Sequence, residues 1–188
     1  MKYFKLLPFV FALCIFASCG SGNSNSGAQQ LSKEEILSNI AKAEKDLYPG
    51  GDKFTFDSKK ALNLVQAYEA FVTANPTDNA SADYLFKSAE IYRSLKDFKK
   101  SNECYEKIIS QFPSYEKAAH SLFLMGFCYE NDLKQLDKAK ALYQKFLNQY
   151  PEHELRDDVE FSLNNIGKSP EEIIKQFEEK NKDKKPEA

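Results

Sequence analysis

Three stretches of this chain repeat one another at a nearly constant spacing. Each contains a tyrosine and ends, eight residues later, at a proline. The tyrosines are Tyr68, Tyr105 and Tyr143, and the prolines are Pro76, Pro113 and Pro151. Both series advance by 37 and then 38 residues. A unit of this length buries its apolar face only by stacking on its neighbours, and stacked helical units offer an extended concave surface that suits protein binding.

Each unit is predicted to be a pair of antiparallel helices. Apolar and small residues recur at steps of three and four, as one helix face requires. They are Leu85, Ala89 and Tyr92 in one unit and Leu122, Gly126 and Tyr129 in the next. The small residues Ala89 and Gly126 are expected to let the second helix of each pair approach closely.

The closing prolines predict where the second helices end, because proline lacks an N–H and its ring crowds the preceding turn. The turn between paired helices is expected at residues 94–97 in one unit. In the following unit the corresponding turn, within residues 131–137, is one residue longer.

These features resemble tetratricopeptide repeats over roughly residues 57–167. The resemblance implies an all-α fold of antiparallel helix pairs stacked as a short right-handed solenoid. The chain departs from the family pattern because it has no tryptophan, and because Asn164 and Gly167 replace the small residue and the tyrosine in the unit after Pro151. That unit is therefore expected to be a degenerate end cap.

Two further helices are predicted outside the repeats, each opened by a serine with a glutamate three residues later. Ser32 opens one through about Leu47. Ser169, followed by Pro170, opens the other, whose apolar residues are expected to seal the open end of the stack. These residues are Ile173, Ile174 and Phe177. The helical domain is expected to span residues 31–180, followed by a disordered tail at 181–188.

The N-terminus reads as a targeting signal. Lys2 and Lys5 precede an apolar stretch of about a dozen residues, which is too short to span a bilayer. Residues 16–19, Phe-Ala-Ser-Cys, resemble a bacterial lipobox, which implies a signal peptide at 1–18 and a lipid on Cys19. An ordinary secretory signal with an incidental cysteine is the alternative.

The residues after Cys19 suit an anchored protein. Residues 19–30 form a Gly, Ser and Asn-rich tether with a reach of roughly 15–20 Å. No acidic residue precedes Glu34, which by analogy with lipoprotein sorting implies the periplasmic side of an outer membrane. Membrane contact is therefore expected through the lipid.

The net charge and the cysteines limit the classes of function that fit this chain. Without residues 1–18 the chain has a net charge near −4, and no basic patch of the kind that binds nucleic acid stands out. Cys104 and Cys128 each precede a tyrosine assigned to the core, so they are expected to be small buried hydrophobes, with a disulfide as the alternative.

No catalytic constellation is evident. His120 and His153 lack partners at metal-ligand spacing, and Gly167-Lys168-Ser169 imitates a phosphate-binding loop without its first glycine or a preceding strand. The chain is predicted to be no enzyme and to hold no cofactor or metal.

A partner-binding face is predicted on the first helices of the units. Phe86, Phe123 and Phe161 recur at spacings of 37 and 38 residues, either as core residues or as aromatic anchors of a groove. Five further residues belong to the same side: Glu90, Arg93, His120, Phe127 and Glu130.

Together these features predict a lipid-anchored, periplasm-facing scaffold that holds an envelope protein or peptide in its groove. The chain resembles the small lipoproteins of outer-membrane protein assembly (BamD-type) and the repeat domain of the Tol–Pal periplasmic coordinator. An accessory subunit or regulator of a cell-wall enzyme or secretion complex is the alternative.

Overall fold

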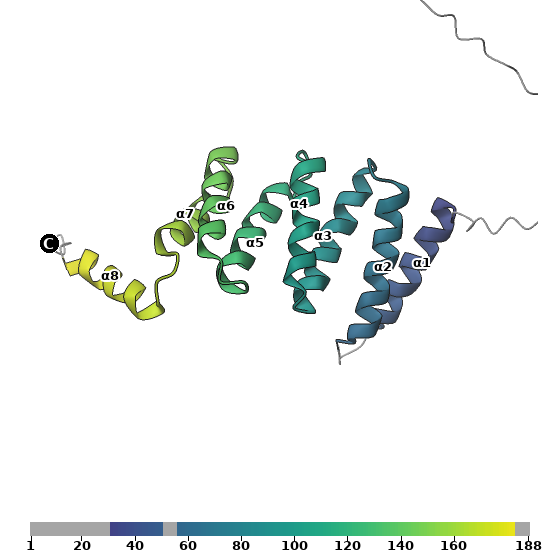
Figure 1. The fold of residues 1–188 in the computed structure, drawn as a ribbon, viewed down its shortest axis with the longest axis horizontal. Coiled ribbons are helices and arrows are strands. Elements are labelled where there is room, and N and C mark those ends of the chain that lie inside the picture. Colours follow the sequence, from purple (N-terminus) through teal and green to yellow (C-terminus); the bar gives the residue numbers. More distant parts are fainter. Residues whose placement is uncertain (1–30, 51–55, 183–188) are drawn as a thin grey trace, which may run out of the picture. The chain divides into compact units, whose positions relative to one another are not determined.

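The computed structural model describes residues 31–50 and 56–182. The predicted signal peptide, Cys19, the tether and residues 183–188 lie outside these ranges. The described residues form helices joined by turns, with no strand among them (Figure 1). The helices are α1 Lys33–Leu47, α2 Ser58–Ala74, α3 Asn79–Ser94, α4 Phe98–Gln111, α5 Ala118–Asn131, α6 Leu136–Gln149, α7 Arg156–Asn165 and α8 Pro170–Lys182. The all-α prediction is confirmed.

Local signals explain the helix boundaries. The Ser32 hydroxyl accepts from the Glu35 N–H at 3.2 Å while the Ser32 N–H donates to the Glu35 carboxylate at 2.8 Å, which completes a capping box. Asp57, Asp78 and Asp97 accept first-turn N–H groups in the same way at α2, α3 and α4. Helices α2, α4 and α6 each end two residues before a closing proline, as predicted.

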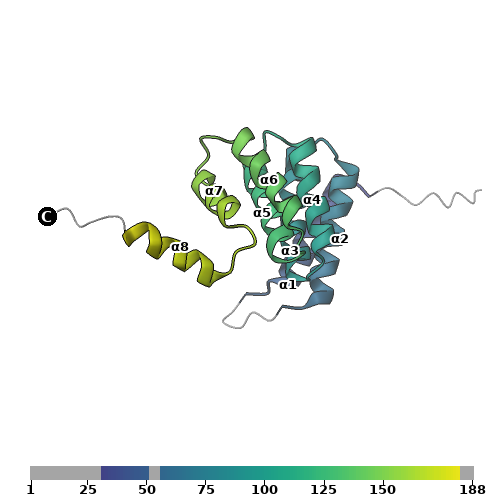
Figure 2. The same ribbon diagram turned by 60° about the vertical axis from the view of Figure 1, so that its left-hand side comes forward.

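The helices pack in chain order. Contacts join α1 to α2, α2 to α3, and so on to α7, and Figure 1 shows these helices following one another in a row. Figure 2 shows the same helices turned by 60°. This order confirms a helical solenoid. It also shows that α1 is the partner of α2, so the stack begins one helix earlier than the repeat spacing indicated.

The repeat residues form the core. Tyr68, Tyr105 and Tyr143 are all buried, and the close approach predicted at Gly126 is confirmed. A Cβ atom added to Gly126 would lie 2.7 Å from Cε1 of Tyr143, inside van der Waals contact. The small residue on the first helix therefore makes room for the tyrosine ring of the second.

Cys104 and Cys128 are buried free thiols, so the alternative of a disulfide is not realised. Burial raises the pKa of the Cys104 thiol to about 12 and that of Cys128 to about 11. Both cysteines therefore stay protonated and act as small apolar side chains, as expected.

The C-terminal end differs from the prediction. Ser169 and Glu172 form the expected capping box, with hydrogen bonds of 2.7 and 3.2 Å, and α8 runs on through residues 181 and 182 that were assigned to the tail. However, Ile174 and Phe177 are 58% and 51% exposed, so the expectation that α8 seals the stack is wrong. Helix α7 buries only Val159, so it offers α8 little apolar surface to cover.

None of the helices in the part of the chain that the structure describes has both the length and the apolar character needed to cross a bilayer.

Candidate protein-binding face

The predicted partner-binding residues lie on three first helices. Phe86, Glu90 and Arg93 are on α3, Phe161 is on α7, and the other four are on α5. The α3 and α5 groups meet, because the Arg93 guanidinium lies over the Phe127 ring at 5.1 Å. Arg93 Nε is also 3.9 Å from a carboxylate oxygen of Asp132, just after α5. Phe161 instead stacks on Phe177 of α8, with ring centroids 6.2 Å apart.

The recurring phenylalanines of α3 and α5 are half-buried. Phe86 meets the Tyr105 ring edge to face at 6.0 Å, and the Lys117 ammonium lies over it at 5.0 Å. Phe123 lies between Phe127 and Tyr143, with ring centroids 6.3 and 6.2 Å away. Each ring therefore rests on a core tyrosine and keeps part of its surface in water. This placement is intermediate between the two alternatives left open by the sequence, a core residue and an aromatic anchor of a groove.

Glu90 and Glu130 have a structural role that sequence reasoning missed. The Tyr105 hydroxyl donates to Glu90, and the Tyr143 hydroxyl donates to Glu130 at 2.7 Å. On α1, Glu44 accepts from Tyr68 in the same way, also at 2.7 Å. Each hydrogen bond joins the two helices of a pair. The recurrence of a buried tyrosine was the available signal, because a buried hydroxyl requires a partner.

These tyrosines remain neutral donors. Burial, reinforced by the carboxylate acceptor, raises the pKa of Tyr68, Tyr105 and Tyr143 well above the ordinary value for a phenol. The tyrosine–glutamate pairs therefore fix the walls of the face rather than offering two free carboxylates to a partner.

A cavity of about 490 Å³ opens beside Phe86 and Glu90. Its aromatic lining comes from Tyr48, Phe56, Tyr68 and Phe86, which belong to α2, α3 and the segments on either side of residues 51–55. Its charged lining comes from Glu44, Lys87, Glu90 and Lys117. An apolar side chain fits such a pocket, and the mixed charges around it suit the polar groups of a polypeptide.

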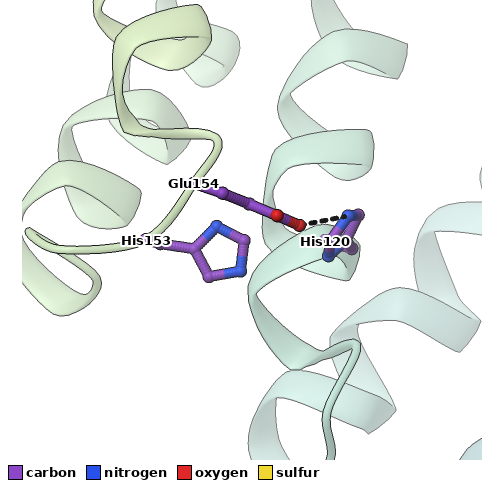
Figure 3. Close-up of side chains that lie close together, drawn as sticks. All are labelled: His120, His153 and Glu154. Atoms are coloured by element: carbon purple, nitrogen blue, oxygen red, sulfur yellow. Dashed lines mark ion pairs between the residues drawn. The ribbon is translucent and has the colours of Figure 1, made fainter.

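His120 lies apart from this cavity. Its ring faces His153 and Glu154, which precede α7 (Figure 3). The Nε2 atom of His120 is 3.9 Å from a carboxylate oxygen of Glu154, and the two histidine ring centroids are 5.4 Å apart. The spacing of residues in the sequence did not indicate this cluster, because the two histidines are 33 positions apart. Imidazole nitrogens and a carboxylate are possible metal ligands.

Residues 83–115 and 120–153 match the family model of the tetratricopeptide repeat. The first match begins within α3 and extends through α4, and the second covers most of α5 and all of α6. A search of curated proteins found no significant match. The region from α3 to α6 is therefore similar to tetratricopeptide repeats, which generally bind protein partners.

Proposed function

We propose that this chain is a lipid-anchored scaffold that faces the periplasm and binds a segment of an envelope protein. The observation that supports binding is the cavity beside Phe86, which has an aromatic lining on the side of the stack that carries the half-buried phenylalanines of α3 and α5. Aromatic anchors in partly desolvated pockets supply much of the energy of protein interfaces.

The expected ligand is a polypeptide segment with one aromatic or large aliphatic side chain for the cavity. Lys87 and Lys117 flank the cavity as donors, and Lys87 also lies 3.0 Å from the Glu44 carboxylate. Because both positive and negative side chains line the cavity, the partner segment is expected to carry both polar and charged groups rather than a single block of charge.

The proposed lipid anchor is inferred from the sequence of residues 16–19, which lie outside the described residues. A lipid on Cys19 and the tether through residue 30 would hold α1 close to the membrane surface, within a reach of roughly 15–20 Å. Several acyl chains give stable anchoring where a single chain is marginal. We place the protein on the periplasmic side of an outer membrane, with a role in outer-membrane protein assembly or envelope organisation.

Site-specific photocrosslinking in intact cells tests the binding face. A photoreactive phenylalanine analogue at Ser94, an exposed residue that lines the cavity, should crosslink to one or a few envelope proteins. The same analogue at Lys107, an exposed residue of α4 that does not line the cavity, is the matched control. Equal crosslinking at both positions, or none at Ser94, would contradict the proposed face. The identity of the captured protein separates outer-membrane assembly from regulation of a cell-wall enzyme or secretion complex.

Cys19→Ala tests the anchor separately. Without the thiol there is no acceptor for the lipid, so the variant should leave the membrane fraction after a high-salt wash. Retention of the variant at the wild-type level would rule out lipidation at Cys19, whatever the crosslinking result.

A further inference from the structure

Successive junctions of the stack use the same structural position. The residue two places after each closing proline contacts a residue near the start of the preceding first helix. At the first junction Lys33 Nζ lies 2.7 Å from Asp78, and at the second the Tyr115 hydroxyl donates to Asp83 at 2.6 Å. At the third junction the corresponding residues are His120 and His153. These pairs link the beginning of one unit to the beginning of the next.

The third junction has a different chemistry. A short polar contact closes each of the first two, whereas the histidine rings of the third lie edge to face with centroids 5.4 Å apart. The nearest carboxylate, that of Glu154, is 3.9 Å from His120 Nε2. His120 Nδ1 is buried without a hydrogen-bond partner in the described part of the chain. Buried polar atoms of this kind call for an explanation.

We propose that His120, His153 and Glu154 bind a divalent transition-metal ion, of which Zn²⁺ is the best fit, and that this ion closes the third junction. One ligand atom from each residue lies within 4.8 Å of the other two (Figure 3). Two imidazoles and one carboxylate form a ligand set suited to zinc, with water in the fourth position. The hard cations Mg²⁺ and Ca²⁺ prefer oxygen ligands and fit this set poorly.

The distances require a modest contraction. Zinc binds nitrogen and oxygen at about 2.0–2.2 Å, so ligand atoms in a tetrahedral site lie about 3.3 Å apart. Glu154 can supply most of the movement because its side chain is 76% exposed. The His153 ring is held more firmly, since it lies edge to face against Phe146 and is also close to Tyr150.

Metal binding has one identifiable cost. His153 Nδ1 accepts a hydrogen bond from the Leu155 N–H at 3.1 Å. A metal at Nδ1 takes the same lone pair, and a metal at Nε2 requires the ring proton to reside on Nδ1. Either mode removes this hydrogen bond. Since Leu155 immediately precedes α7, the Leu155 amide should report metal binding at the start of that helix.

Zinc titration of the full-length protein without a histidine tag tests the site. We expect one equivalent of Zn²⁺ to bind, to raise the melting midpoint, and to shift the Leu155 amide resonance. Mg²⁺ and Ca²⁺ should leave the midpoint unchanged. A wild-type midpoint and amide spectrum that do not respond to Zn²⁺ would overturn the proposal.

The chain itself offers the matched control. The double variant His120→Asp/His153→Tyr places at the third junction the pair that closes the second. It should fold without metal, keep all its cysteines, and lose the zinc-dependent rise in midpoint. An equal rise in this variant would show that zinc binds elsewhere and would overturn the assignment.

Glu154→Gln supplies a second comparison that does not depend on refolding of the junction, because the side chain is exposed and both histidines remain. Loss of the charged ligand should weaken zinc binding at least about tenfold, in the range seen when a partner of a metal site is lost. Wild-type zinc affinity in this variant would exclude Glu154 as a ligand and overturn the three-residue site.

Discussion

The middle of the stack and its C-terminal end carry similar local helix signals but bury very different amounts of apolar surface. In α4 and α6 the large rings of Tyr105, Tyr143 and Phe146 are completely buried. In α7 and α8 the large rings stay half exposed, with Phe161 46% and Phe177 51% exposed. Helix formation and helix packing are therefore decided by different residues.

The residue opposite the large ring differs between the two regions. Gly126 leaves room for the Tyr143 ring, and Ala89 takes the equivalent buried position in the preceding unit. After Pro151 that position is Asn164, which is exposed, polar and larger than glycine or alanine. A capping box starts a helix, whereas burial requires a small residue opposite a large one.

Phe146→Ala and Phe177→Ala are expected to show the largest contrast. Removal of the buried Phe146 ring leaves a cavity and should lower the free energy of unfolding by about 3–5 kcal/mol. Removal of the half-exposed Phe177 ring should change it by no more than about 0.5 kcal/mol. Urea denaturation of both variants measures the two values. Similar losses would mean that α8 contributes to the core as much as α6 does.

Gly126→Leu addresses the recess directly. Because even a Cβ at this position would lie 2.7 Å from the Tyr143 ring, the larger side chain should overpack the pair at a cost of about 1–3 kcal/mol. Asn164→Leu is the matched change at the C-terminal end and should be nearly neutral. The comparison by thermal melting fails if both variants melt at the wild-type midpoint, since Gly126 would then not be a close-approach site.

Tyr143→Phe tests the hydrogen bond that joins α5 and α6 in the middle of the stack. Loss of the bond to Glu130 should cost about 1 kcal/mol at neutral pH. Because the folded-state pKa of Tyr143 is raised, its contribution is complete below the unfolded value, near 10, and declines as the pH rises above it.

The variant should therefore lose less stability than wild type between pH 9 and 11. Denaturant midpoints at each pH give the comparison. A parallel decline in wild type and variant would show that Tyr143 does not contribute to the alkaline loss.

Most of the middle region follows from the sequence. Proline at each closing position predicts the ends of α2, α4 and α6, because it acts within a few residues. The pairing of α1 with α2 was missed because the segment between Leu47 and Ser58 interrupts the repeat spacing. Glu44 and Tyr68, which join these helices, are 24 residues apart.

The candidate binding face was predicted less completely. Phe86 and Glu90 do line a cavity, but Tyr48 and Phe56 complete it from outside the repeat pattern. The proximity of His120 to His153 depends on how consecutive units stack, which no single helix periodicity reports. The close approach of Gly126 to Tyr143 within a pair was therefore predictable. The tyrosine–glutamate hydrogen bonds within pairs, and the contacts between pairs, required the structure.

Ser169→Ala is expected to have the smallest global effect and gives the most direct separation of helix formation from packing. The Ser169 hydroxyl accepts the Glu172 N–H at 3.2 Å, so its removal should fray the first turn of α8 and increase amide hydrogen exchange there. The global melting midpoint should stay unchanged because α8 buries little apolar surface.

Asp97→Ala is the matched change at α4, where the carboxylate accepts the Lys100 N–H at 3.2 Å. Since α4 carries buried Tyr105, loss of this cap should lower global stability by about 0.5–2 kcal/mol. If Ser169→Ala lowered the global midpoint as much as Asp97→Ala, α8 and α4 would unfold as one cooperative unit. The exposed face of α8 would then have to contribute to the stability of the stack.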